Sequence, residues 1–322
     1  MTVSISTDSV RPTERQAYWT EAICRSFANV ETRPLGASVV SGHFEFFEIG
    51  DAKLVRFDSS PQCYRRDSRL VSAAGSDDFM FDFQTRGRSW MTQGTKEGAI
   101  EPGFGVLYDA RRPFEDRLDG PGQRAEVLIA TMPAASLSAT FANAERSCAM
   151  PVPLSGVVSC SIARLVRSLL RPAEDRGDAN PDQNDIVAYI GAILRQGQGM
   201  PHQLNRSQLY ALVDIHLRQK LAARHLPHAL AAGFGVSERT FHRIFSDRGT
   251  TFERHILRRR VERFRALLSQ RSLSGASIAK LALECGFADA AHASRTFKSA
   301  FEQTPRDYRV NAMLQGCREA RQ

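Results

Sequence analysis

The stretch ECGFADAAHASRTFKSAFEQTPRDYR, residues 284–309, decides the fold of the C-terminal third of the chain. The apolar segment SIAKLALECGF, residues 277–287, predicts a first helix. Gly286 near its end predicts a turn, and a second helix follows the turn. Asp289 is the predicted N-cap of that helix, because its carboxylate can accept the free backbone N–H groups at a helix start. Apolar residues recur along the helix at helical spacing and predict its buried side: Ala290, Ala293, Phe297 and Phe301. The stretch therefore predicts a helix–turn–helix whose small alanines let the two helices approach closely.

The opposite side of the same helix carries residues suited to the DNA major groove. An alanine can contact a thymine methyl group, and an arginine can bond to guanine or to phosphate. The side chains on this face are Ala291, His292, Arg295 and Ser299. The alternative for this unit is loose packing, in which Ala293 simply leaves a small core. For a similar unit earlier in the chain, the alternative is a solvated charged face.

A weak internal repeat places a similar unit earlier in the chain. Gly233-Phe234 recurs as Gly286-Phe287, and Arg243-x-Phe245 recurs as Arg295-x-Phe297. In the earlier unit, LPHALAAGFGVSERTFHRIFSDRGTTF, Ser237 is the predicted N-cap of the second helix. The predicted DNA-facing residues of this unit are Ser237, Glu238, Arg239, His242 and Arg243. The segment TTFERHILRRRVERFRALLSQ predicts one long basic helix that joins the two units.

Charge divides unevenly along the chain. Residues 201–322 contain 21 Lys and Arg against 10 Asp and Glu, whereas residues 1–200 contain 22 against 25. A basic C-terminal third on a mildly acidic body indicates a polyanionic partner such as DNA, although a solvated basic surface is as common.

The N-terminal part predicts a different class of structure. Short segments rich in Val, Phe and Tyr, punctuated by Gly, Pro and Asp, run from about 39 to 131 and are typical of a β-barrel or sandwich. Two helices and the linker-like segment RQGQGMPHQLNRS follow. We expect an α+β protein with two domains, 1–200 and 201–322, the second of them all-α.

An apolar stripe on the predicted helix 155–170 has two interpretations. The stripe consists of Ile162, Leu165, Val166 and Leu169. It can pair with a second copy of the chain to form a homodimer, or it can be buried inside its own domain.

Enzyme chemistry finds little support in the sequence. Residues 1–200 hold one histidine, His43, which predicts no metal site. Ser277-Ile-Ala-Lys280 matches an SxxK motif without its companions, and no phosphate-binding glycine loop occurs. We therefore predict no catalytic residues and no cofactor.

The N-terminus and the cysteines predict a compartment. MTVSISTDSVRPTER has neither the basic nor the apolar region of a secretory signal, and the six cysteines are scattered. We expect reduced thiols, no membrane association and a location in the cytoplasm of a prokaryotic-type cell.

Residues 209–309 resemble the DNA-binding domain of AraC/XylS-type transcription regulators. The resemblance rests on GVSERTFHRIF, GTTFERHILRRRVERFRALL, SIAKLALECGFAD and SRTFKSAFEQTPRDYR. Residues 18–200 resemble the sensor domain of one branch of this family, through WTEAICRSF, DDFMFDFQTRG and EPGFGVLYDARRPF.

The resemblance implies a cupin-like barrel with dimerisation helices, followed by two helix–turn–helix motifs. It also implies a ligand-responsive activator that binds promoter DNA and works with RNA polymerase, often at a catabolic operon for an amine, amide, nitrile or aromatic acid. The alternative is a ligand-independent DNA-binding regulator whose barrel only dimerises. Five aromatic residues can line a pocket, although barrel core is the favoured interpretation of each: Phe79, Phe81, Phe83, Trp90 and Tyr108. Arg65 and Arg66 can pair with an acidic effector or simply be exposed.

Overall fold

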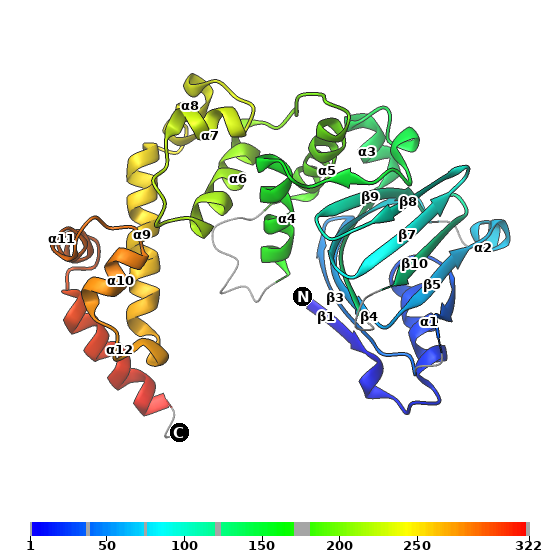
Figure 1. The fold of residues 1–322 in the computed structure, drawn as a ribbon, viewed down its shortest axis with the longest axis horizontal. Helices are drawn as coiled ribbons and strands as arrows, with labels where there is room; N and C mark the ends of the chain where they lie inside the picture. The colour runs from blue at the N-terminus through cyan, green and yellow to red at the C-terminus, as the bar shows by residue number, and fades with distance from the viewer. Residues whose placement is uncertain (1, 37–38, 74–75, 120–123, 171–180, 320–322) are drawn as a thin grey trace. The chain divides into compact units, whose positions relative to one another are not determined.

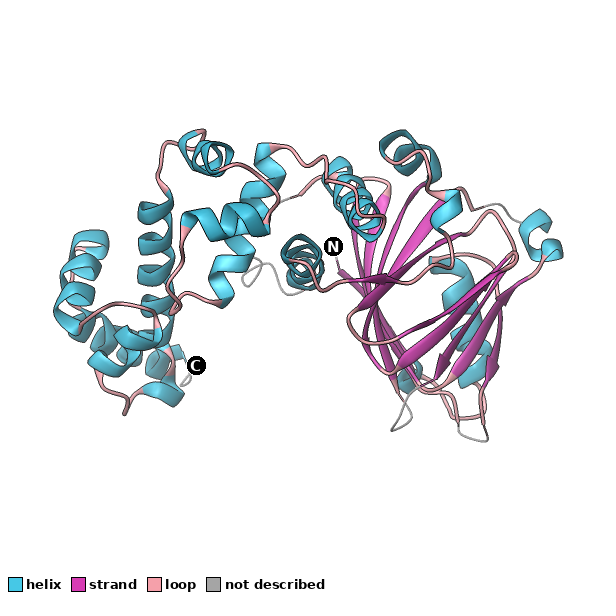
Figure 2. Cartoon of the chain, turned by 45° about the horizontal axis from the view of Figure 1, so that its top comes forward, coloured by secondary structure: helices cyan, strands magenta, loops and turns pink. Residues whose placement is uncertain are grey.

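The computed structural model describes residues 2–36, 39–73, 76–119, 124–170 and 181–319. The chain forms two compact units, Met1–Gln208 and Leu209–Gln322. In the described residues every strand lies in the first unit, and the second unit is helical (Figure 2).

Two antiparallel sheets form the first unit (Figure 1). The larger sheet has seven strands, in the spatial order β1 (Thr2–Ser6), β3 (Gly42–Ile49), β4 (Ala52–Ser59), β11 (Ala125–Pro133), β6 (Asp78–Arg86), β9 (Phe104–Asp109) and β12 (Val152–Pro153). The smaller has five, in the order β2 (Glu31–Pro34), β5 (Gln62–Arg66), β10 (Phe114–Asp119), β7 (Arg88–Gln93) and β8 (Lys96–Ile100). The predicted α+β class is confirmed. Among the described strands, no pairing joins the two sheets into a closed barrel.

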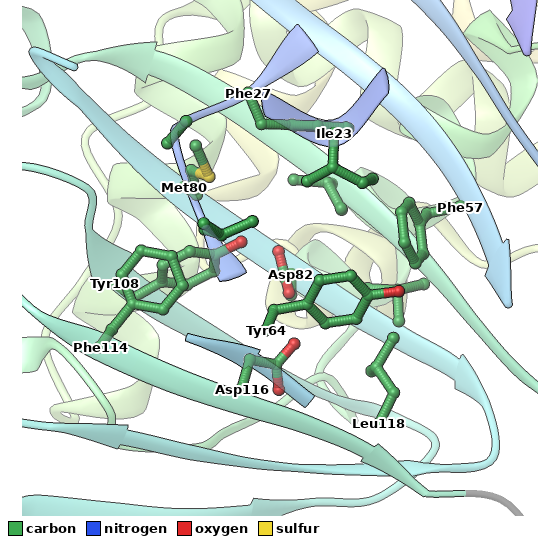
Figure 3. A pocket seen from close by; sticks show the side chains of 14 residues that line it. Ile23, Phe27, Phe57, Tyr64, Met80, Asp82, Tyr108, Phe114, Asp116 and Leu118 are labelled. Carbon is green, nitrogen blue, oxygen red and sulfur yellow. The ribbon is translucent and has the colours of Figure 1, made fainter. Parts of the chain in front are cut away.

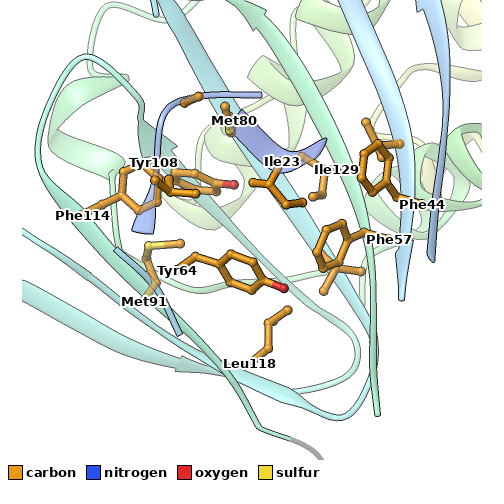
Figure 4. Close-up of a cluster of buried hydrophobic side chains, with 14 of the residues drawn as sticks. Ile23, Phe44, Phe57, Tyr64, Met80, Met91, Tyr108, Phe114, Leu118 and Ile129 are labelled. Atoms are coloured by element: carbon orange, nitrogen blue, oxygen red, sulfur yellow. The ribbon is translucent and has the colours of Figure 1, made fainter. Parts of the chain in front are cut away.

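A core of aliphatic and aromatic side chains packs between the sheets (Figure 4). Helix α1 (Arg15–Ser26) contributes Trp19, which is fully buried. Its ring meets Phe44 at 5.5 Å and Phe57 at 5.4 Å between centroids, and its indole N–H donates to the Tyr64 hydroxyl at 3.1 Å. Tilted and edge-to-face contacts of this kind stabilise aromatic clusters beyond the burial of apolar area.

Strand β6 is buried on both faces because helices cover the side of the larger sheet that faces away from this core. Phe79, Phe81 and Phe83 alternate with Met80 and Asp82, and all five are at most 3% exposed. The helices that complete the unit are α2 (Ser68–Ala73), α3 (Ala134–Thr140), α4 (Val157–Leu169) and α5 (Gln183–Gly197). Of these, α3 and α5 contact β11, and α3 also contacts β6.

The stripe on α4 belongs to the core of its own chain. Ile162, Leu165, Val166 and Leu169 are between 0% and 2% exposed, and α4 packs against α5 and β4. The dimerisation interpretation of this stripe is therefore wrong. Side chains buried to this degree within one chain have no apolar surface left to offer a second copy.

The second unit is built from α6 (Arg206–Gln219), α7 (Pro227–Gly233), α8 (Glu238–Ser246), α9 (Phe252–Ser269), α10 (Ile278–Glu284), α11 (Ala290–Phe301) and α12 (Pro305–Glu319). The predicted pair of helix–turn–helix motifs corresponds to α7–α8 and α10–α11, and α9 is the predicted joining helix. The last helix, α12, begins at Pro305 and spans fifteen residues.

The two repeated turns rest on glycines in the left-handed region. Gly235 has φ +65° and Gly286 has φ +88°, conformations that side chains with a Cβ rarely adopt. At Gly286 an added Cβ would also lie 2.3 Å from the carbonyl oxygen of Leu221. Glycine is thus required there for backbone conformation and for close packing.

Candidate nucleic-acid interface and sensor pocket

Helix α8 is fixed in place by its cap and by an aromatic core. The Ser237 hydroxyl accepts the backbone N–H of Thr240 at 3.1 Å, which confirms the predicted N-cap. Phe241 and Phe245 are at most 1% exposed, and both contact the ring of Phe252 at the start of α9. One side of α8 is therefore buried against the rest of its unit.

The other side of α8 faces solvent with long polar side chains. Ser237, Glu238, Arg239, His242 and Arg243 are all exposed. Within the described part of the chain, the guanidinium groups of Arg239 and Arg243 enter no hydrogen bond or ion pair. Two free guanidinium groups on the exposed side of one helix are available donors for base edges or phosphates.

Helix α11 repeats this arrangement with smaller side chains. The Asp289 carboxylate accepts the backbone N–H of His292 at 2.7 Å, which confirms the predicted N-cap and holds the pKa of Asp289 below its usual value. Ala293 and Phe297 are fully buried, in a cluster that includes Phe264 of α9. The small Ala293 side chain is therefore packed within the hydrophobic core of the second motif.

The outer side of α11 is less uniform than the sequence predicts. Ala291, Arg295 and Ser299 are exposed, whereas His292 is half-buried and packs against the Phe287 ring at 5.6 Å. No hydrogen bond or ion pair engages the Arg295 guanidinium in the described ranges. Arg295 is therefore the available long donor among the predicted residues of this helix.

A groove between α9 and α11 extends this surface. Arg254 and Arg258 of α9 line it together with Arg295 and Ser299 of α11. One acidic residue, Glu262, is also part of the lining. Three arginines in one groove provide a place for phosphates, which make up half or more of the contacts in protein–DNA complexes.

Helix α6 is tied to α9 by a buried carboxylate. Asp214 accepts hydrogen bonds from His255 at 2.7 Å, from Arg218 at 2.7 Å and, through two nitrogens, from Arg259 at 2.6 and 2.7 Å. Burial alone would raise the pKa of Asp214, but the bonds from His255 and Arg259 outweigh it and lower that pKa. The network orients α9, against which both helix–turn–helix motifs pack.

Ser277 of the SxxK match has a structural role. Its hydroxyl caps α10 by accepting the backbone N–H of Lys280 at 3.1 Å. Among the described residues, no group of three or more His, Cys, Asp or Glu side chains is arranged to hold a metal ion. No described helix is both long and apolar enough to cross a membrane.

An interior cavity of about 50 Å³ lies between the two sheets of the first unit (Figure 3). Helix α1 and strands from both sheets provide its walls. The lining residues are Ile23, Phe27, Ala28, Val30, Phe57, Tyr64, Met80, Asp82, Tyr108, Phe114, Asp116, Leu118, Val127 and Ile129.

Two carboxylates give this cavity its electrostatic character. Asp82 is 3% exposed and Asp116 is 7% exposed. Burial raises the pKa of Asp116 to about 7. Burial and the nearby Asp116 raise the pKa of Asp82 well above its usual value, although a hydrogen bond from the Tyr108 hydroxyl favours the charged form.

The structure divides the candidate pocket residues among cavity lining, core and surface. Of the aromatic candidates only Tyr108 lines the cavity, because Phe79, Phe81 and Phe83 point to the opposite face of β6. Trp90 is 43% exposed. Arg66 is buried and donates to the carbonyl oxygens of Asn29 and Ala110 at 2.6 and 2.9 Å, while Arg65 is exposed.

Sequence reasoning missed Asp82 and Asp116. A signal was present for Asp82, which is a charged residue between apolar neighbours in FMFDF. Asp116 lies between Glu115 and Arg117 in FEDRL, so no such pattern marked it. A charge in such a segment marks either an exposed face or a buried functional group.

Comparisons with known proteins match both units. Residues 19–190 match the model of the AraC-binding-like domain, and residues 230–311 match that of a helix-turn-helix domain. The transcriptional activator NphR of Rhodococcus is 23% identical over 273 residues, covering 81% of this chain and 78% of NphR. The HTH-type transcriptional activator RhaS of Citrobacter koseri is 29% identical over 170 residues, covering 49% of this chain and 59% of RhaS.

A further relative is an uncharacterized protein encoded in the nit 5' region of a Bacillus strain, OxB-1. It is 26% identical over 171 residues, covering 53% of this chain and 64% of that protein, which is less than two thirds of its length. Among solved structures, the AraC-like transcriptional activator CuxR aligns with 81% of this chain and 94% of its own at 16% identity, with a TM-score of 0.48.

Proposed function

Because the chain belongs to the AraC family of transcriptional regulators, we propose that it is a ligand-responsive activator of a catabolic operon. In this proposal residues 1–200 sense the effector, and residues 201–322 bind promoter DNA and bring RNA polymerase to it. Relatives named as transcriptional activators support activation. The family is one of transcription factors rather than enzymes.

The observation that carries the proposal is the pair of helices α8 and α11. Each has one side buried in an aromatic cluster and the other side exposed with arginines that have no partner among the described residues. Arg239 and Arg243 on α8 and Arg295 on α11 are therefore donors that are available to a ligand outside the chain. Their positions on the exposed sides of the second helices of the two motifs fit the reading of base edges in the major groove.

A titration of duplex DNA against the full-length protein tests DNA binding. Operator sequences are first selected from a random duplex library, and affinity is then measured by fluorescence anisotropy between 50 and 300 mM salt. We expect a linear fall of log affinity with log salt, with a slope of roughly −0.9 for each phosphate neutralised. No selected sequence and no salt dependence would contradict the proposal.

The alternative function, a regulator that needs no effector, is tested with the same operator. A small molecule that binds the first unit raises its unfolding temperature, because ligands stabilise the state they bind. Tryptophan emission reports that unit alone, since both tryptophans of the chain, Trp19 and Trp90, lie in it. If no compound changes both the melting temperature and the activity at the operator, the ligand-independent alternative is correct.

A further inference from the structure

Asp82 and Asp116 face the same cavity from opposite sheets. Asp82 lies on β6 of the seven-stranded sheet, and Asp116 lies on β10 of the five-stranded sheet. Both line the cavity, and their carboxylates point toward its interior (Figure 3). One acidic side chain from each wall therefore meets a single small space.

Each of these carboxylates has an oxygen atom without a partner. Among the described residues, Oδ1 of Asp82 and Oδ1 of Asp116 are buried and accept no hydrogen bond. Buried polar atoms in native proteins are nearly always satisfied, and an exception calls for an explanation. The lining contains no Lys, Arg or His that could compensate the charge.

The remaining walls of the cavity are apolar and aromatic. The two carboxylates are surrounded by aliphatic side chains and by the rings of Phe27, Phe57 and Phe114. A space of about 50 Å³ holds roughly three to five water-sized groups before any side chain moves. The cavity thus offers two anionic acceptors at one point and an apolar surface elsewhere.

We propose that this cavity binds an organic ammonium ion with a short apolar body, whose nitrogen donates to Asp82 and Asp116. The inference deepens the proposed function, on which it rests, by naming the chemical class of the effector. A primary ammonium carries three N–H donors, enough for both orphaned oxygens, and its positive charge balances the buried carboxylates. The alkyl or aryl body fills the apolar remainder.

Other classes of ligand fit the cavity less well. A carboxylic acid would bring a third acidic group to two that already repel each other. A divalent metal ion prefers six or more oxygen ligands, and the apolar walls offer few beyond Asp82, Asp116 and the tyrosine hydroxyls. A neutral alcohol or amide would satisfy hydrogen bonds without balancing charge.

The experiment uses the full-length protein, three organic probes of similar size and one metal salt. Butylammonium is compared with butan-1-ol, butyrate and magnesium chloride by calorimetry and by tryptophan-detected melting. Trp19 is a suitable reporter because its indole N–H bonds to Tyr64, which lines the cavity. We expect butylammonium alone to bind, and Asp82→Asn and Asp116→Asn each to weaken it about tenfold or more.

Glu115→Gln is the matched control. Glu115 precedes Asp116 on β10 and is absent from the cavity lining, so the variant loses the same charge from the same strand. We expect its affinity for butylammonium to equal that of the original protein. Equal weakening by Glu115→Gln and Asp116→Asn would mean that net charge, and not the cavity, determines binding.

The pH dependence of binding gives a readout that does not depend on any variant. The titratable groups that face the cavity are Asp82, Asp116, Tyr64 and Tyr108, and burial raises the pKa of all four. An ammonium ion requires charged carboxylates, so binding should release protons and become tighter from pH 6 to pH 8. Tighter binding at pH 6, or preference for butan-1-ol, would overturn the inference in favour of a neutral ligand, and preference for magnesium would overturn it in favour of a metal site.

Failure of this inference and failure of the proposed function are distinguishable. If the protein binds its operator and responds to a compound without an amino group, the proposed function stands and the ammonium site is wrong. If butylammonium binds through Asp82 and Asp116 but changes neither DNA binding nor transcription, the site stands and ligand responsiveness is wrong.

Discussion

Asp116 holds its proton to a higher pH in the folded protein than in the unfolded chain. Its pKa is raised to about 7 from the ordinary value of 3.8, because its carboxyl group is buried between two sheets. Between these two values the folded state binds more protons than the unfolded state. The free energy of unfolding of the first unit therefore falls as pH rises from about 4 to about 7 and then levels off.

This linkage predicts a stability difference that depends on one residue. We expect Asp116 to lower the free energy of unfolding by about 2–3 kcal/mol between pH 5 and pH 8, and Asp116→Asn to remove that slope. Asp82, whose pKa is also raised, adds in the same direction. Urea unfolding followed by tryptophan emission at both pH values provides the measurement. A slope that persists in the double variant Asp82→Asn/Asp116→Asn would exclude these carboxyl groups as its source.

Arg239 and Arg295 are expected to serve different purposes on DNA. Arg239 lies beside His242 and Arg243 on α8, whereas Arg295 lies near an exposed alanine and lines the groove with Arg254 and Arg258. Arg239→Ala should cost roughly 1–3 kcal/mol at the selected operator and relax one or two base preferences. Arg295→Ala should weaken binding to all sequences more evenly and flatten the salt slope.

A randomised operator library read with both variants decides between these roles. Arg263→Ala is the control, because Arg263 is exposed on α9 outside the two recognition helices. If Arg295→Ala changes the preferred sequence and Arg239→Ala does not, the assignment of roles is reversed.

At the level of the element, α4 illustrates how an apolar stripe is used. Leu165 is fully buried in its own unit, so Leu165→Glu should produce insoluble protein rather than a soluble monomer. Leu165→Ala should lower the free energy of unfolding by about 2–5 kcal/mol, as truncation of a buried leucine usually does. Arg167→Glu on the exposed side of the same helix is the control and should have little effect. A soluble, folded Leu165→Glu protein would contradict the packing of α4.

At the start of α8, substitutions of Ser237 should separate its role in capping the helix from any contact that it makes with DNA. Ser237→Ala removes the acceptor for the Thr240 N–H and should destabilise α8 by about 1 kcal/mol, measured as faster hydrogen exchange of its amides. Ser237→Asn keeps a capping side chain and should preserve exchange rates. If Ser237→Asn nevertheless weakens operator binding, Ser237 also contacts DNA, whereas unchanged binding limits it to the cap.

The helical elements of the second unit were predictable because their signals are local. Ser237 and Asp289 bond to amides three residues away, and Gly235 and Gly286 set the turns within the same short segments. The internal repeat added the pairing of the two motifs. The half-burial of His292 against Phe287 was not predictable from helical spacing, because it depends on the angle between α10 and α11.

The first unit was less predictable because its contacts join distant parts of the chain. β11 pairs with both β4 and β6, so residues near 130 meet residues near 54 and 81. Alternation along β6 could not identify the cavity-facing side, since both of its faces are buried. The partners of Arg66 are the carbonyl oxygens of Asn29 and Ala110, which no local pattern reveals. An amphipathic helix such as α4 likewise indicates an apolar side without naming what covers it.

At the scale of the whole molecule, α9 determines how the two motifs are spaced. Its N-terminal end contacts α8 through Phe252, and Phe264 further along it contacts Phe287 and Phe297 of the second motif. We expect the two recognition helices to read one face of the DNA about one helical turn, roughly 34 Å, apart. Insertion of five base pairs between the two halves of an operator should therefore reduce affinity to that of one motif, as measured by anisotropy. Undiminished binding would show that the two motifs do not read DNA as one rigid unit.

The separate aromatic clusters at the two ends of α9 have a consequence for how the protein can evolve. A change on the exposed side of α11 leaves the packing of Phe241 and Phe245 untouched, and the reverse holds for α8 and Phe297. One recognition helix and its half of the operator can thus change while the other helix and its half stay the same. The unchanged half retains part of the affinity for DNA during that change. A duplicated gene of this design could move to a new promoter through intermediates that each still bind DNA.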